Sequence, residues 1–322
     1  MSPYSKELSL DPQHFTLWAP ERGMTVPVGP EQTPVPLPVI PLPIHPEALK
    51  EGNPSANAMG EGVNDYLRQF PDCLRNRQYA ELLRDAYPHY LADLGAQILL
   101  IDHREVDSES IRQKISYMKI LALLDPGNSG LRLRLGIEYY QLSQMFSEFA
   151  DARSSLLKAM GYLQEVLKAD PENLQALNVL GRIDYLFGDY PSAVARWRQV
   201  VDKLPPGEAR DSLSEMAARL QGQEPPETPL IDDYEYIGAA MDSYGQGHYE
   251  EAVTTLDIIE ERGQFTAEIP CCEFYHFLGM CRSRMGNTGG AFEALEKALE
   301  LNPDYTEARE AMDRLLETGK SH

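Results

Sequence analysis

Apolar residues recur with helical periodicity from about Leu74 to the end of the chain. Asp125-Pro126, Asp170-Pro171 and Asn302-Pro303 each place a capping side chain directly before a proline, an arrangement that starts helices. No convincing alternation of apolar and polar residues with a period of two accompanies this pattern. The pattern therefore predicts an all-α body.

The first 54 residues differ, because they contain 12 of the 24 prolines. Proline removes a backbone donor and pushes the preceding residue toward extended conformations, so residues 1–61 are predicted to form an extended arm, polyproline-like or irregular. The residues between the prolines are apolar, whereas a solvated linker is usually polar. We therefore expect the arm to pack on a helical surface, with three anchors: Leu37, Ile40 and Leu42.

The body contains a repeat of small and large residues. One copy has Leu180-Gly181, Tyr185, Ala193, Trp197 and Pro205, and the same skeleton returns as Leu278-Gly279, Gly286, Ala291, Leu295 and Pro303. The small residues allow two helices to approach closely, and the large ones fill the space beside them. This skeleton resembles the tetratricopeptide repeat, which implies antiparallel helix pairs of 34 residues stacked into an α-solenoid.

The resemblance covers about residues 77–316. A copy over 131–171 carries 11 extra residues between its halves, which we expect to extend its hairpin. Extra helices are expected at 209–221 and 305–316. The predicted organisation is listed from the amino terminus: the arm, 1–61; a first repeat stack with the extended hairpin and an extra helix, 62–222; a proline hinge, 223–230; and a second stack with a capping helix, 231–322.

In such repeats the first helix of each pair lines a concave groove. Residues at positions i, i+4 and i+7 of these helices share one face. The predicted groove residues are Leu133, Ile137, Tyr140, Asn178, Arg182, Tyr185, Ile237, Met241, Tyr244, His276 and Met280. Tyrosine and methionine suit an apolar or amphipathic partner segment, and Tyr185 and Tyr244 are its expected contacts. The alternative is that much of this stripe is ordinary core.

The composition narrows the class of partner. The formal charge of -21 repels nucleic acid and anionic membrane surfaces, so neither is an expected partner. No apolar run approaches the ~20 residues of a membrane span. Met1 to Leu17 contain no continuous apolar run, so we expect no secretory signal and a cytoplasmic location. The four cysteines lack CxxC spacing, so we expect reduced thiols. The groove has no lysine for the carboxylate clamp of chaperone-adaptor repeats.

Signals for catalysis or metal binding are weak. Ser155-Leu-Leu-Lys158 matches a nucleophile pattern but lies within a predicted helix without partner motifs. The glycine-rich segments 245–247 and 286–290 occupy expected interhelical turns and lack the lysine of a phosphate loop. Cys272 and His276 could share a helix face, but two ligands do not make a zinc site. We expect no enzyme, cofactor or metal.

The sequence thus favours a non-catalytic scaffold or adaptor that binds a protein segment in its concave groove. The partner's identity is open, and the chain's own arm and another copy of the chain are both candidates. The alternative is an accessory subunit of a larger assembly, anchored by the proline-rich arm, with the repeats as a rigid spacer.

Overall fold

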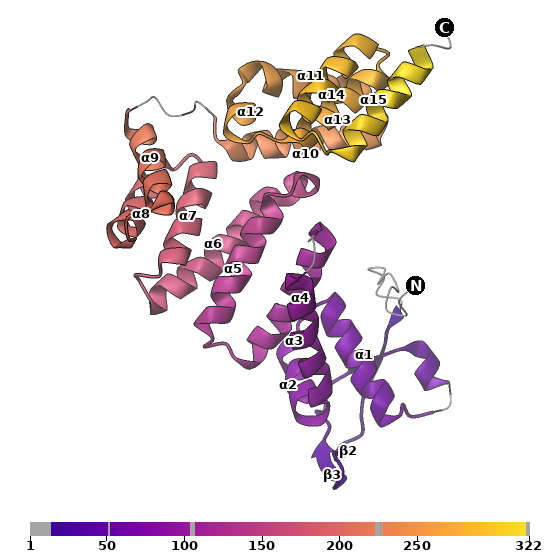
Figure 1. Ribbon diagram of the computed structural model, residues 1–322. Coiled ribbons are helices and arrows are strands. Elements are labelled where there is room, and N and C mark those ends of the chain that lie inside the picture. Colours follow the sequence, from indigo (N-terminus) through magenta and orange to yellow (C-terminus); the bar gives the residue numbers. More distant parts are fainter. Residues whose placement is uncertain (1–13, 51, 104–106, 223–225, 227, 320–322) are drawn as a thin grey trace. The chain divides into compact units, whose positions relative to one another are not determined.

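Helices dominate the computed structural model, which describes residues 14–50, 52–103, 107–222, 226 and 228–319 (Figure 1). The all-α prediction is confirmed for the body of the chain. The chain divides into two units, Met1–Leu135 and Gly136–His322, and the boundary falls within helix α5 (Ser129–Ser143). None of the helices in the described ranges has both the length and the apolar character of a membrane span.

Four short strands form the proline-rich arm. Strand β1 (Thr16–Trp18) pairs antiparallel with β4 (Leu42–Ile44), and β2 (Thr25–Val28) pairs antiparallel with β3 (Thr33–Pro36). In the β2–β3 pair, Pro27 lies opposite Pro34, and Pro36 lies opposite Thr25 two residues further along. The prolines thus occupy every second residue pair, the pairs that form no hydrogen bonds across the ladder, where a missing N–H group is tolerated. The expectation of a polyproline-like or irregular arm is therefore wrong for these residues.

The arm packs against the helices of its own unit. A short 3₁₀ helix, η2 (Pro46–Leu49), leads to α1, and the helices are α1 (Ala56–Gln69), α2 (Asn76–Ala86), α3 (Pro88–Asp102) and α4 (Ser108–Leu124). A Cβ at Gly62 would lie 2.4 Å from the Pro43 carbonyl oxygen, so only glycine allows α1 this close to β4. The Tyr79 hydroxyl donates a hydrogen bond of 2.7 Å to the Pro41 carbonyl.

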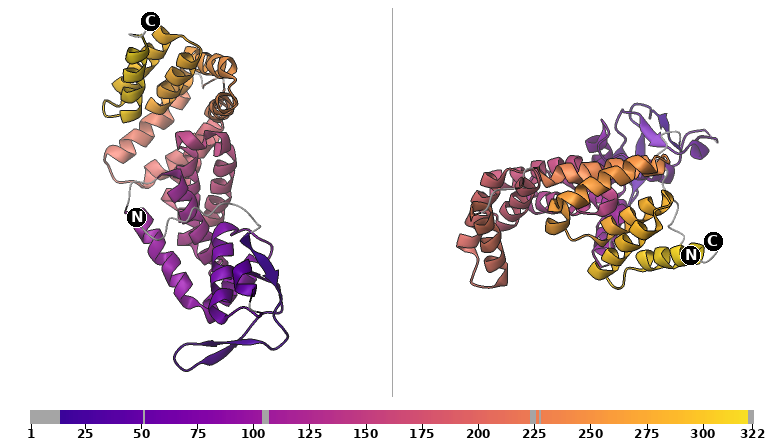
Figure 2. Two further views of the ribbon diagram at one scale, coloured as in Figure 1. Left: turned by 90° about the vertical axis from the view of Figure 1, so that its right-hand side faces the viewer. Right: turned by 90° about the horizontal axis from the view of Figure 1, so that it is seen from above.

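The second unit is built of antiparallel helices that follow one another along the chain (Figures 1 and 2). After α5 come the 3₁₀ helix η3 (Phe146–Asp151), α6 (Ala152–Ala169), α7 (Leu174–Leu186), α8 (Tyr190–Lys203), α9 (Glu208–Gly222), α10 (Leu230–Gly245), α11 (Tyr249–Arg262), α12 (Gln264–Glu268), α13 (Cys272–Arg284), α14 (Thr288–Leu301) and α15 (Thr306–Gly319).

Small residues set the distance between paired helices. A Cβ at Gly181 of α7 would lie 2.5 Å from Nε1 of the buried Trp197 on α8, and one at Gly279 of α13 would lie 2.9 Å from Leu295 on α14. The turn before α8 contains Gly188 in the left-handed region, and Asp189 then caps the helix. The repeated small residues therefore allow the close helix packing that the sequence predicts.

The extra residues between α5 and α6 form η3, which packs against α10. The rings of Phe149 and Tyr234 stack with centroids 4.0 Å apart. Gly238 brings the α10 backbone against Ala150, since a Cβ there would lie 2.5 Å from the Ala150 Cα. The extra segment thus packs against α10, in addition to lengthening the hairpin as the sequence predicts.

An ionic network joins α11, α13 and α14. Arg282 donates hydrogen bonds of 2.7 Å to both Asp257 and Glu260, and Lys297 donates a third, also 2.7 Å, to Glu260. Burial alone would raise the pKa of Glu260, but the hydrogen bonds from Lys297 and Arg282 outweigh burial and hold the pKa below its ordinary value.

Candidate functional site

The predicted groove residues divide by exposure. Tyr185 and Ile237 are buried, with 8% and 0% of their surface exposed, so both contribute to the core. Arg182 is exposed. The others are half-buried and are listed here: Leu133, Ile137, Tyr140, Asn178, Met241, Tyr244, His276 and Met280. The helical stripe therefore mixes core positions with positions that a partner can reach.

Two predicted groove residues, His276 and Met280, line a cavity of about 570 Å³. We call it the α13 cavity. It is lined by Gln144, Met145, Phe146, Ser147, Cys271, Glu273, His276, Phe277, Met280 and Tyr305. Its volume falls in the range of ligand pockets, ~300–1,000 Å³. Tyr244 adjoins it, because its ring centroid lies 5.5 Å from that of Phe277.

Apolar side chains form much of the cavity wall. Phe277 of α13 has an edge contact with Phe146 of η3, with centroids 6.2 Å apart. Met280 lies one helical turn after His276 on α13, and Met145 directly precedes η3. Flexible methionines beside rigid aromatic rings allow such a wall to adapt to different apolar side chains.

Polar groups gather at the α13 amino terminus. The thiols of Cys271 and Cys272 each donate a hydrogen bond of 3.2 Å to Oε2 of Glu273. Burial is the largest influence on all three groups and would raise each pKa. The backbone and thiol hydrogen bonds nevertheless hold the pKa of Glu273 below its ordinary value, whereas the pKa values of Cys271 and Cys272 rise to about 12 and about 11. The cavity edge therefore contains an ionised carboxylate and two protonated thiols at neutral pH.

His276 and Tyr305 form the adjacent polar edge. The Tyr305 hydroxyl and the His276 Nδ1 lie 3.3 Å apart, within hydrogen-bonding distance. Burial lowers the pKa of His276, so the imidazole is neutral at pH 7. This edge offers hydrogen-bonding groups without adding a positive charge.

The arm anchors lie in the first unit. Leu37, Ile40 and Leu42 are all buried, with exposed fractions of 5%, 8% and 0%. Val39, between them, is 66% exposed. The anchors' surfaces are thus covered within this chain.

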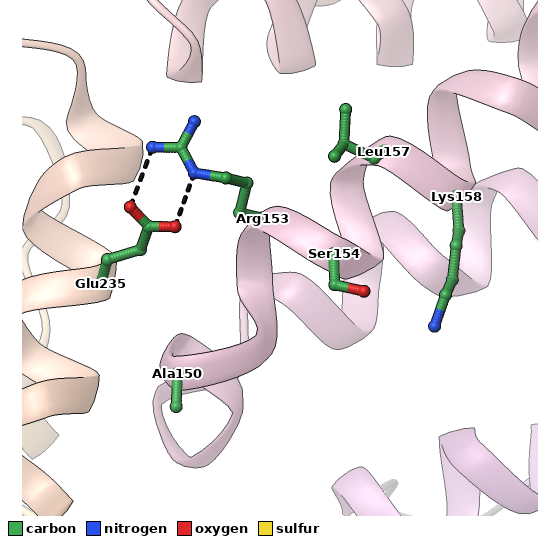
Figure 3. Close-up of a pocket in the computed structure, with 6 residues that line it drawn as sticks. All are labelled: Ala150, Arg153, Ser154, Leu157, Lys158 and Glu235. Atoms are coloured by element: carbon green, nitrogen blue, oxygen red, sulfur yellow. Dashed lines mark hydrogen bonds and ion pairs between the residues drawn. The ribbon is translucent and has the colours of Figure 1, made fainter.

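A second cavity, of about 540 Å³, is lined by Ala150, Arg153, Ser154, Leu157, Lys158 and Glu235. Figure 3 shows Arg153 paired with Glu235 through two hydrogen bonds, of 2.5 and 2.9 Å. Arg153 also donates to Asp232 at 2.8 Å. Because its charge is matched by α10, this arginine contributes to the docking of α10 on α6.

The weak catalytic signals have structural explanations. Ser155 is buried inside α6, and the Lys158 ammonium lies over the Tyr139 ring, 5.6 Å from its centroid. Gly247 and Gly286 take left-handed conformations in turns between helices. Across the part of the chain that the structure describes, no group of three or more histidine, cysteine or acidic side chains is placed to hold a metal.

Several cavity residues had no local signal in the sequence. Met145 and Phe146 belong to the extra segment, and Tyr305 lies between α14 and α15. Phe277 follows the predicted groove residue His276, but its role depends on the contact with Phe146. The resemblance predicts the face of α13 but not the segments that close the cavity beside it.

The helix pair of α13 and α14 corresponds to a known family. Residues 273–305 match the family model of the tetratricopeptide repeat. Residues 273–305 thus form a tetratricopeptide repeat. The match spans α13, the turn at Gly286, α14 and the following Asn302-Pro303, so the tetratricopeptide helix pair carries one wall of the α13 cavity.

Similar solved structures have low identity to this repeat protein. The crystal structure of MamA protein has 14% identity and a TM-score of 0.28, covering 67% of this chain and 94% of MamA. TTC0263, a thermophilic TPR protein of Thermus thermophilus, has 18% identity and a TM-score of 0.25, covering 58% of this chain and 98% of that one. The APC/C hetero-tetramer Cut9-Hcn1 has 16% identity and a TM-score of 0.29, covering 80% of this chain and 42% of the other. No curated protein matches the chain.

Proposed function

We propose that this chain is a non-catalytic scaffold or adaptor that binds an apolar or amphipathic segment of another protein in the α13 cavity and on the half-buried groove residues beside it. The observation that carries the proposal is the cavity wall formed by Met145, Phe146, Phe277 and Met280. Burying one bulky apolar side chain contributes about 1.5–3 kcal/mol, and ordering a segment offsets part of this gain. We expect micromolar or weaker binding for a short segment.

Features of the cavity support binding over catalysis. The two thiols at its edge are protonated at neutral pH, whereas a nucleophilic cysteine acts as the thiolate. Its histidine lies beside a tyrosine hydroxyl, and its carboxylate already accepts two thiol hydrogen bonds. The arrangement suits recognition of a side chain.

The alternative, an assembly subunit anchored by the arm, has less support. Its anchors would have to face a partner, but Leu37, Ile40 and Leu42 are buried within the first unit. The cytoplasmic location stays a prediction.

The proposal is tested by selecting peptides from a random displayed library against the full chain and following the methionine methyl groups by NMR. We expect selected peptides to shift the signals of Met145 and Met280, while the fully buried Met118 of the first unit keeps its signal. Met280→Gln should weaken binding at least fivefold, a loss of about 1 kcal/mol.

Met285→Gln is the matched control, because Met285 directly follows α13 and is 47% exposed outside the cavity lining. Equal effects of the two substitutions, or selected peptides that leave Met145 and Met280 unshifted, would contradict the proposal.

A further inference from the structure

The α13 cavity has one residue with a formal charge at neutral pH among those that line it, Glu273. The Glu273 carboxylate is half-buried at the first turn of α13. The two cysteines that precede it in the sequence donate thiol hydrogen bonds but carry no charge. The lining of the cavity itself therefore carries a negative charge.

Two arginines of this unit, Arg282 and Arg219, pair with acids other than Glu273. Arg282 pairs with Asp257 and Glu260, and Arg219 pairs with Glu268 at 2.8 Å. Within the described residues, Glu273 forms no ion pair with a lysine or arginine. A half-buried carboxylate without a basic partner favours a cation that approaches from outside.

We propose that the α13 cavity selects a segment in which a lysine or arginine lies beside a bulky apolar side chain. The apolar side chain occupies the wall of Met145, Phe146, Phe277 and Met280, and the cation pairs with Glu273. This inference rests on the proposed function, to which it adds the chemical class of the partner.

The charge of the whole chain acts in the same direction. A formal charge of -21 raises the local concentration of cationic segments and repels acidic ones. A partner with an acidic carboxyl-terminal tail would bring its negative charge close to that of Glu273 and be repelled. The expected partner segment is therefore basic and amphipathic.

The test uses capped soluble peptides that share a Leu-Leu pair in a Gly-Ser background and differ in the next residue, which is Lys, Gln or Glu. Affinity is measured from the methyl shifts of Met145 and Met280 in the full chain. We expect the Lys peptide to bind about tenfold more tightly than the Glu peptide, with Gln between them, and the ratio to shrink as salt is added.

Glu273→Gln should reduce the Lys-to-Glu ratio to about the value expected from net charge alone, a change on the order of fivefold. Glu300→Gln is the matched control, because Glu300 is exposed on α14 of the same unit and its substitution changes the net charge equally. It should leave the ratio nearly unchanged.

Two outcomes separate this inference from the proposed function. If the three peptides bind equally, or if Glu273→Gln and Glu300→Gln act alike, the inference is overturned while apolar binding stands. If no peptide shifts Met145 or Met280, the proposed function fails and the inference fails with it. Should Glu273→Gln not fold, the peptide series and its salt dependence on the unmodified chain still decide the matter.

Discussion

Gly238→Ala tests whether α10 docks on the extra segment. The added Cβ would lie 2.5 Å from the Ala150 Cα and 2.7 Å from the Ala150 backbone nitrogen. Backbone atoms cannot rotate away as a side chain can, so α10 and η3 must separate. Such overpacking costs about 1–3 kcal/mol of unfolding free energy. This cost acts against the gain of about 0.5–1 kcal/mol that alanine has over glycine in a helix interior.

Gly161→Ala in α6 is the matched control. Gly161 is exposed, and a Cβ there would meet nothing within 4 Å, so only the gain in helix stability applies. The gain in helix stability is common to both variants, so they should differ by the overpacking cost alone, about 1–3 kcal/mol.

Urea unfolding followed by circular dichroism measures this difference, and hydrogen exchange of the α10 amides shows whether the loss is local. Exchange should accelerate in α10 of Gly238→Ala and stay unchanged in Gly161→Ala. If Gly238→Ala stabilises the chain as much as Gly161→Ala does, α10 does not pack closely on η3 and the role assigned to the extra segment is wrong.

Two further substitutions test a core position and an ionic network. Tyr185→Ala should lower the unfolding free energy by about 3 kcal/mol, because the buried ring packs on Trp197; unchanged melting would instead leave Tyr185 free for a partner. Glu260→Gln should cost about 1–2 kcal/mol at neutral pH. The pKa of Glu260 is lowered in the folded state. The contribution of its charge to the unfolding free energy is therefore present above the unfolded-state pKa of about 4.3 and disappears as the pH falls through the folded-state pKa. Wild type and Glu260→Gln should accordingly reach the same stability in acid unfolding curves.

The repeat helices could be predicted because their signals are local. The extra helix expected at 209–221 corresponds to α9 (Glu208–Gly222), and the one expected at 305–316 corresponds to α15 (Thr306–Gly319). Caps, turn glycines and small residues at fixed spacing all act within one helix pair, so a single repeat contains enough information to predict its own fold.

The strands of the arm were missed although their signal is also local. Pro34 and Pro36 lie two residues apart, and Pro27 faces Pro34 across the hairpin. Prolines with this period occupy only non-hydrogen-bonded rungs, so they are compatible with a short antiparallel ladder. The number of prolines suggested a polyproline conformation, whereas the two-residue spacing of the prolines is what indicates antiparallel strand pairing.

Helical spacing could not separate core from groove in the predicted stripe. Tyr185 and His276 both come from first helices of their pairs, but Tyr185 packs on Trp197 and His276 lines a cavity. The difference arises from what lies opposite each helix. For α13, that neighbour is the extra segment around Phe146, more than a hundred residues earlier in the chain.

The extra segment therefore has two effects that no single repeat contains. Through Phe149 and Ala150 it supports α10, and through Met145 and Phe146 it forms a wall of the α13 cavity. A change that loosens the contact between the extra segment and α10 should also widen the α13 cavity, because the same short segment carries both sets of side chains. Peptide binding by Gly238→Ala should accordingly be weaker than by Gly161→Ala, even though neither glycine lines the cavity. Equal binding by the two variants would show that the docking of α10 and the shape of the cavity are independent.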